Sequence, residues 1–176
     1  MTEAKKSFDC SIKDAEQLLI RFDEENKSTS QSNAETLKRA GMVIAMAAWE
    51  TYVKDRFKEE TSCWLAPVNG SSLGNFVQRK INEDLKRFFN PGTERTKQLF
   101  KDYFEIDITG GWSWDNYQIP QAKKVLNDLI SKRGDAAHKA NTSPNAPHII
   151  KRDELDKAIR FLKGLVNATE KVVIFK

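Results

Sequence analysis

Apolar residues recur at three- and four-residue steps along most of this chain, and this spacing predicts α-helices almost throughout. The first stripe consists of Phe8, Ile12, Ala15, Leu19 and Phe22. A helix with such a stripe buries one face and leaves the other in water. We therefore expect the chain to begin with one amphipathic helix, followed by a polar, turn-rich connection at 26–33.

A second helix is predicted from about residue 34 to about residue 64. Its segment 41–49 is apolar on all sides, which indicates a central, buried position. Gly41, Ala45 and Ala48 share one face, and their small size allows another helix to approach closely there.

The middle of the chain predicts shorter elements. Residues 66–74 are rich in glycine, serine, asparagine and proline, and they indicate a loop. Two short helices are expected at about 75–89 and 93–104. The residues between them, Asn90-Pro91-Gly92, are a strong stop signal.

Residues 106–119 show no helical period but contain Trp112, Trp114 and Tyr117 beside a Gly-Gly pair. We interpret this segment as an ordered loop held to the core by its rings, since aromatic side chains bury large apolar areas. The alternative is that the rings stack on nucleic-acid bases. The Gly-Gly pair is not a phosphate-binding loop, because the G-x4-G-K-[ST] pattern is absent.

Two amphipathic helices complete the chain, separated by a polar, proline-bearing loop at 141–147. Pro120 suits the first turn of the earlier helix, and the last helix begins near residue 153. The earlier helix has an apolar face of Ala122, Val125, Leu126, Leu129 and Ile130. The predicted fold class is therefore all-α, an up-down bundle of about four main helices. We expect one domain over 1–176 with a small helical and loop insertion at about 66–119.

Composition agrees with a folded domain. Of the 176 residues, 39% are hydrophobic and 31% are charged, so a core is possible and wholesale disorder is not expected. The net charge of +4 permits nucleic-acid binding without demonstrating it. Cys10 and Cys63 are too far apart in sequence for a CxxC metal site, and we expect reduced thiols in the core.

Several classes of protein are excluded by missing patterns. No apolar run approaches the ~20 residues that cross a membrane, and the N-terminal residues include no apolar signal region. We therefore expect a cytoplasmic protein. Neither a G-x-S-x-G elbow nor an H-E-x-x-H sequence is present, which argues against serine-hydrolase and zinc-protease chemistry. We expect no cofactor and no metal.

Arg133 and His138 are the residues most typical of a chemical site. Arg133 lies on or near the apolar face of Leu126 and Leu129, where a charged group must be paired, exposed at a mouth or placed at an interface. His138 points about 140° away in an ideal helix. Either Gly134 breaks the helix between them, or a symmetric dimer brings two copies face to face. The alternatives are, for Arg133, a snorkelling arginine near the helix end or a structural ion pair, and, for His138, an ordinary surface histidine.

An R-x4-H pair late in an all-helical chain, followed by one amphipathic helix, resembles the HEPN superfamily. Residues 48–60 (AWETYVKDRFKEE) add to this resemblance, because they are similar to the buried-then-charged W-E-x-Y helix of RiboL-PSP-type HEPN proteins. The resemblance extends from about Thr36 to Val173. The short helices and the Trp-rich loop fit an insertion between the core helices of such members.

The resemblance implies a function. Many HEPN proteins are metal-independent endoribonucleases of toxin–antitoxin, anti-phage or RNA-processing systems, and act as dimers whose motifs line one cleft. Arg133 and His138 match the two motif positions. Gly134 stands where active members usually have a polar residue, and some HEPN proteins are non-catalytic modules that bind RNA, a nucleotide or a partner protein. The implied partners are RNA, a second copy of the chain and an antitoxin or other defence protein. We expect no association with a membrane.

The chemistry implied by the resemblance suits these two residue types. A histidine, with a side-chain pKa of about 6.5, can accept the ribose 2′-OH proton at neutral pH. An arginine can hold the charge that develops on the phosphate through its planar fork. The second His138 of a dimer, or a water, would protonate the departing 5′-oxygen. The expected product carries a 2′,3′-cyclic phosphate.

Other residues are supporting candidates. Glu50 is a candidate to orient Arg133 across the core. Asp135 lies about one turn before His138 and is a candidate to orient that residue. The alternative for each is a solvated acid with no role in the site. The cations that would form a phosphate-attracting RNA-binding rim are Lys132, Lys139, Lys151 and Arg152. His148 follows a proline, and we interpret it as a loop residue outside the site.

Overall fold

The computed structural model of the protein describes residues 1–28, 31–139 and 147–172. The α-helices in these ranges are α1 (Glu3–Ser28), α2 (Gln31–Leu65), α3 (Ser72–Lys86), α4 (Thr93–Phe104), α5 (Ile119–His138) and α6 (Arg152–Glu170). Two 3-10 turns, η1 (Ala66–Val68) and η2 (Ile108–Gly111), lie between them. Within the described ranges no residue lies in a β-strand, so the all-α prediction is confirmed.

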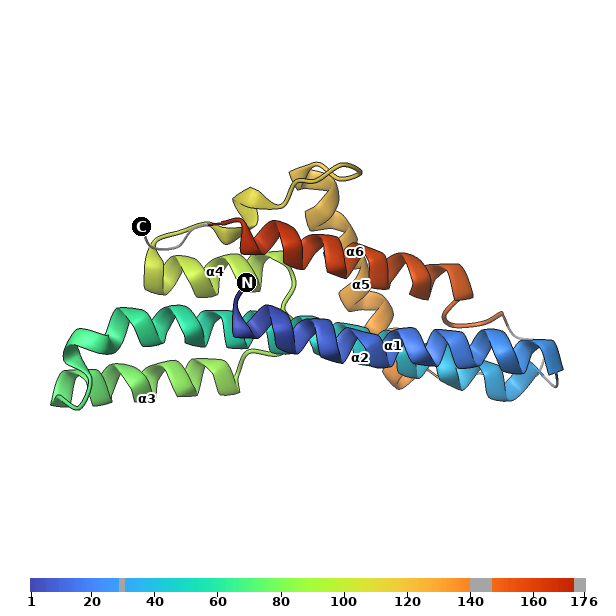
Figure 1. The fold of residues 1–176 in the computed structure, drawn as a ribbon, viewed down its shortest axis with the longest axis horizontal. Helices are drawn as coiled ribbons and strands as arrows, with labels where there is room; N and C mark the ends of the chain where they lie inside the picture. Colours follow the sequence, from blue (N-terminus) through green and yellow to red (C-terminus); the bar gives the residue numbers. More distant parts are fainter. Residues whose placement is uncertain (29–30, 140–146, 173–176) are drawn as a thin grey trace.

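The two longest helices, α1 and α2, lie side by side as an antiparallel pair (Figure 1). The last helix, α6, runs along this pair, and α5 crosses α2. The C-terminal half of α2 extends beyond α1, and there α3 and α4 accompany it. The first residues lie beside the end of α6, where Thr2 donates to the Glu170 carboxylate from its backbone N–H (3.3 Å) and its hydroxyl (2.8 Å).

The middle of α2 forms the centre of the core, as its apolar sequence predicts. Met42, Ala45 and Trp49 are completely buried there. The small residues of this helix admit α6 at close range: a Cβ placed on Gly41 would lie 2.7 Å from Cδ2 of Leu155. The predicted close approach of a second helix is therefore confirmed, and that helix is α6.

Some element boundaries differ from the prediction. α1 continues through residues 26–28, which were assigned to the connection. α3 begins at Ser72, inside the predicted loop 66–74, because the hydroxyl of Ser71 accepts a hydrogen bond from the Gly74 N–H (3.0 Å) and caps the helix. α4 spans the predicted range. Residues 29–30 of the predicted connection and residues 141–146 of the predicted loop lie outside the described part of the chain.

The Trp-rich loop is held to α6 by its rings, as interpreted from the sequence. Trp112 is completely buried, and its indole N–H donates to the hydroxyl of Thr169 at 3.0 Å. The rings of Trp114 and Tyr117 pack on Phe161 with centroids 5.6 and 5.1 Å away. Because these rings contact protein, the arrangement gives no support to the base-stacking alternative.

The thiols are not in the core, contrary to the sequence-based expectation. Cys10 and Cys63 are both free and exposed. Cys10 is two residues from both Phe8 and Ile12, and this offset rotates its side chain about 200° from theirs, toward solvent.

Candidate functional site

Arg133 and His138 both lie in the last two turns of α5, which ends at His138. The helix continues through Gly134 without a break, so the arrangement that relied on a break there is wrong. A single glycine costs a helix only about 1 kcal/mol relative to alanine. Burial of Ala136 in the following turn helps to hold the helix past that position.

The unbroken helix directs the two side chains to different sides. Arg133 continues the stripe of Ala122, Leu126 and Leu129, which are buried, and is itself half-buried. His138 lies about 140° farther around the helix and is exposed. One protomer therefore presents the arginine and the histidine on different faces of α5.

Both motif side chains are unengaged in the described part of the chain, where neither forms a hydrogen bond or an ion pair. The stem of Arg133 is partly covered, but its guanidinium nitrogens still reach solvent, because Nε of Arg56 is the only buried side-chain nitrogen or oxygen without a partner among the described residues. The guanidinium is therefore available to an anion or to a group from another subunit. The structural ion pair considered for Arg133 is not formed among the described residues.

Arg39 of α2 fixes the segment between the two motif residues. Its Nε–H donates to the carbonyl oxygen of Ala136 at 2.8 Å. Carbonyl groups in the last turn of a helix lack partners within the helix, so a cation that binds one stabilises the helix end. Sequence analysis did not find this residue. The only local indication is a cation placed just before the apolar segment 41–49.

Glu35, one turn before Arg39 in α2, binds the segment that leads into α6. Its carboxylate accepts the Ile149 N–H at 2.7 Å and contacts Nδ1 of His148 at 2.9 Å. Residues four apart lie on one face of a helix, about 6 Å from each other. His148 is a loop residue as predicted, but this contact places it near the end of α5 that carries the motif.

A buried lysine lies on the same part of α2. Lys38 is only 2% exposed, and its Nζ lies 4.6 Å from the centroid of the Phe22 ring. Burial lowers the pKa of Lys38, and the nearby carboxylates of Glu35 and Glu154 partly oppose this shift. Charges of both signs therefore meet inside this end of the bundle.

Glu154, in the first turn of α6, is held by two lysines. It accepts hydrogen bonds from the Lys132 ammonium and, at 3.0 Å, from the backbone N–H of Lys151. Burial alone would raise the pKa of Glu154, but these hydrogen bonds outweigh burial, and the pKa is lowered. The carboxylate is therefore kept ionised next to the motif helix.

The two acids considered as supporting groups have other partners. Glu50 accepts from Nζ of Lys54 (2.7 Å) and from the backbone N–H of Asn90 (3.1 Å), which joins α2 to the α3–α4 turn. Asp135 pairs with Lys139 at 2.9 Å. Within the described residues, neither carboxylate contacts a motif side chain.

Most of the predicted rim cations are also paired. Arg152 binds the Asp23 carboxylate through two hydrogen bonds of 3.1 and 2.7 Å. Lys132 and Lys139 have the carboxylate partners named above, and Lys151 is exposed. The positive charge available to a ligand at this end is therefore smaller than the sequence indicates.

The described residues include neither a candidate metal site nor a helix that could cross a membrane. No group of three or more His, Cys, Asp or Glu side chains within those ranges is arranged to hold a metal ion. None of the described helices is both long enough and apolar enough to traverse a lipid bilayer.

An all-α bundle of this kind agrees with the fold expected of a HEPN protein. The family model described as RiboL-PSP-HEPN matches residues 11–174, nearly the whole chain, and the chain belongs to this family. The resemblance inferred from the sequence is confirmed. Comparison with curated proteins gave no match, and comparison with solved structures gave none.

Proposed function

We propose that this protein is a metal-independent HEPN endoribonuclease that cleaves RNA through a 2′,3′-cyclic phosphate, with Arg133 and His138 as its catalytic residues. The observation that carries the proposal is the unengaged state of both side chains at the end of α5, in a chain of the HEPN family. We further propose a cytoplasmic role in toxin–antitoxin or anti-phage defence.

In the proposed reaction His138 removes the proton from the ribose 2′-OH. The 2′-oxygen then attacks the adjacent phosphorus, and the bond from phosphorus to the 5′-oxygen of the next nucleotide breaks. Arg133 binds the phosphate oxygens, where charge develops in the transition state, and a guanidinium suits this task because it stays protonated and presents a planar fork. The leaving 5′-oxygen takes a proton from a second imidazolium or from water.

We propose that two copies of the chain build this site. Arg133 and His138 point about 140° apart on an unbroken helix, so an arginine from one protomer and a histidine from the other would converge more readily than a pair within one protomer. Leu126 and Leu129 on the arginine face are already buried within the protomer. We therefore expect the copies to meet at the polar end of α5.

A second function of another class is favoured by one residue. Gly134 occupies the position that is usually polar in active HEPN proteins, and nothing lies within 4 Å of a Cβ built on it. The second candidate is therefore a non-catalytic HEPN module that binds RNA, a nucleotide or a partner protein.

RNA cleavage by the purified protein in excess EDTA separates the two functions. We expect the wild type to cleave and His138→Ala and Arg133→Ala to lose at least about 100-fold in rate, in the range for loss of a general base or of a charge-stabilising group. End-group analysis should detect a 2′,3′-cyclic phosphate on the product.

A matched variant controls for the charge change. Lys124→Ala removes an exposed cation from the other end of α5, where Lys124 is 81% exposed, and we expect no effect on rate. If the folded wild type binds RNA but cleaves none of a diverse RNA pool, the non-catalytic module replaces the nuclease. Equal cleavage by the wild type and both motif variants would refute the assignment of the site.

A further inference from the structure

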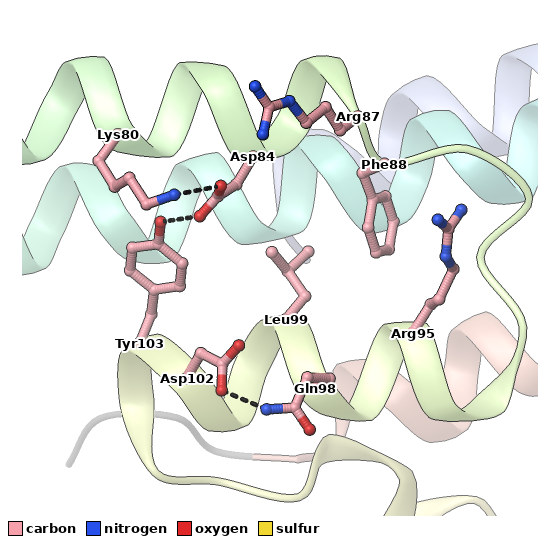
Figure 2. A pocket seen from close by; sticks show the side chains of 9 residues that line it. All are labelled: Lys80, Asp84, Arg87, Phe88, Arg95, Gln98, Leu99, Asp102 and Tyr103. Atoms are coloured by element: carbon pink, nitrogen blue, oxygen red, sulfur yellow. Dashed lines mark hydrogen bonds and ion pairs between the residues drawn. The ribbon is translucent and has the colours of Figure 1, made fainter.

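A pocket lies far from the motif. It opens between α3 and α4, has a volume of about 630 Å³, and is shown in Figure 2. Arg39 of α2 contacts the motif segment, whereas Phe57, 18 residues later in the same helix, contacts the ring of Phe100 in α4. At 1.5 Å per residue these two points of α2 are about 27 Å apart. The pocket is therefore separate from the proposed catalytic site.

The pocket has an apolar floor between two arginines. Phe88 and Leu99 form the floor, and each is only 7% exposed. Arg87 follows the end of α3 and Arg95 lies in α4 just after its N-terminus, and Figure 2 shows them on either side of Phe88. Guanidinium groups bind phosphate through pairs of parallel hydrogen bonds.

Both arginines retain donors that a ligand can use. Within the described ranges, Arg87 forms no hydrogen bond or ion pair through its side chain. Arg95 uses one nitrogen, Nη1, to donate to the carbonyl of Phe89, which fixes its position at the edge of the pocket. Its other nitrogens have no partner in the described part of the chain.

The acidic residues of the pocket are already engaged. Asp84 accepts from Lys80 at 2.8 Å and from the Tyr103 hydroxyl at 2.6 Å, and Gln98 donates to Asp102. In Figure 2 the Asp84 contacts lie on the same side of Phe88 as Arg87, which also acts electrostatically on Asp84, whereas Arg95 lies on the other side. The positive charge that no described carboxylate of the pocket neutralises is therefore mainly that of Arg95.

The surrounding hairpin has the composition of a nucleic-acid surface. Residues 72–104 contain seven Lys and Arg against four Asp and Glu, so three of the four net positive charges of the chain lie here. The same segment exposes two large rings, Phe76 at 60% and Phe89 at 56%. Cations interleaved with exposed aromatic rings are typical of single-stranded nucleic-acid binding.

We propose that this pocket binds one nucleotide unit, with its phosphate held by Arg95, its base on the floor of Phe88 and Leu99, and Arg87 as a second cation at the rim. The volume lies within the range of small-molecule sites, roughly 300–1,000 Å³. The same unit can come from an RNA strand or from a free mononucleotide. The proposal does not require ribonuclease activity; if the protein is a nuclease, a strand bound here is its substrate.

Binding can be measured independently of cleavage with the full-length His138→Ala protein and a fluorescently labelled single-stranded RNA. We expect Arg87→Ala/Arg95→Ala to weaken binding about 10- to 100-fold, the loss of two charge-assisted contacts. Arg87→Lys/Arg95→Lys keeps the charge without the fork and should recover only part of the affinity. Arg87, Arg95 and Lys101 are exposed, and Lys97 is half-buried and pairs with Asp107 at 3.7 Å. We expect the variants to fold, and circular dichroism will verify this.

The control is Lys97→Ala/Lys101→Ala, which removes the same charge from α4 outside the pocket. A similar loss of affinity in the control would overturn the pocket in favour of non-specific attraction. Competition by AMP would identify a free nucleotide as a sufficient ligand, and its failure beside tight RNA binding would identify the strand. Binding of neither RNA nor AMP would reject the proposal, and the cleavage assay of the wild type would be unaffected by that result.

Discussion

Gly134 and Gly164 both lie in helices, but a Cβ added at Gly134 meets open space whereas one added at Gly164 meets a tryptophan ring. Nothing lies within 4 Å of a Cβ on Gly134, so Gly134→Ala should stabilise the protein by about 0.5–1 kcal/mol through helix propensity. A Cβ on Gly164 would lie 2.7 Å from Nε1 of Trp114, a rigid ring, so Gly164→Ala should cost about 1–3 kcal/mol. Urea unfolding measures both changes.

Each glycine variant is the control for the other, because the chemical change is the same. A loss of stability in Gly134→Ala would contradict the open space around α5 and would show that another group, such as a second subunit, occupies it. Unchanged stability in Gly164→Ala would show that Trp114 does not pack as closely on α6 as the structure places it.

Glu154 provides a prediction about pH. The pKa of its carboxyl is lowered in the folded protein, so in acid the unfolded chain binds more protons than the folded one. The ionised carboxylate therefore stabilises the fold above about pH 4.5. This stabilisation is lost as the pH falls through the pKa of the folded state. Glu154→Gln should therefore be less stable than the wild type at pH 7, with the difference shrinking below pH 4. Urea unfolding at pH 7, 5 and 3.5 measures this.

Glu94→Gln is the matched control, since Glu94 is an exposed glutamate in the first turn of α4. It should change the stability at pH 7 less than Glu154→Gln does, because Glu94 forms no hydrogen bond or ion pair through its side chain within the described ranges. A difference between Glu154→Gln and the wild type that stays the same from pH 7 to pH 3.5 would contradict this contribution, because the unfolded chain takes up its proton as the pH passes below about 4.5 and the stabilisation begins to fall there.

At the scale of elements, the sequence predicts helices well and their ends less well. The stripe of α1 and the stop signal before α4 are local patterns, and both elements form where they indicate. The start of α3 depends on the hydroxyl of Ser71, a small polar cap inside a segment that otherwise resembles a loop. Such a cap contributes only about 1 kcal/mol and leaves a weak pattern.

In the candidate site, too, residues within one helix can be predicted from the sequence, whereas contacts between distant segments cannot. Arg133 and His138 are found from spacing within one helix. Arg39 and Glu35 contact residues 97 and 113 positions away, at Ala136 and His148, and no local pattern reports a contact over such separations. Glu50 is a candidate from the sequence to orient Arg133, but in the structure it binds Lys54 and the α3–α4 turn, because the fold places a backbone donor of that turn beside it.

The contact between α2 and α5 leads to a prediction for Arg39. Arg39→Met keeps the apolar stem but removes the donor to Ala136, so the last turn of α5 should fray. Hydrogen exchange at 136–139 should rise while the rest of α5 is unchanged. If Arg39 positions the motif, kcat should fall about tenfold or more with KM little altered, since one misplaced catalytic group costs rate.

Arg39→Lys is the informative companion variant, because a lysine can reach the same carbonyl without the planar fork. It should recover most of the hydrogen-exchange protection and part of the rate. Faster exchange spread over all of α5 in Arg39→Met would indicate a general loss of packing and would contradict a positioning role.

Over the whole molecule, the two proposed sites lie at opposite ends of α2. The motif end mixes charges of both signs, with Glu35, Glu154 and Asp135 among the cations, whereas the α3–α4 hairpin carries an excess of positive charge. This layout is consistent with an RNA strand that is held mainly at the hairpin and cut at the motif. Recognition and cleavage would then be separable by mutation.

The proposed dimer makes the last prediction, which depends on which protomer supplies each catalytic group. In a mixed dimer of Arg133→Ala and His138→Ala subunits, one composite site keeps the Arg133 of one subunit and the His138 of the other, while its symmetry mate has neither. Random mixing makes about half of the dimers mixed, and each mixed dimer has one active site where the wild type has two. The rate should therefore return to about a quarter of the wild-type rate. Each variant alone should stay inactive. Sedimentation should show the mixed species as a dimer. The surviving site keeps one of the two histidines, so its activity requires that water protonate the leaving 5′-oxygen; an inactive mixture that contains mixed dimers would refute a composite site with that acid.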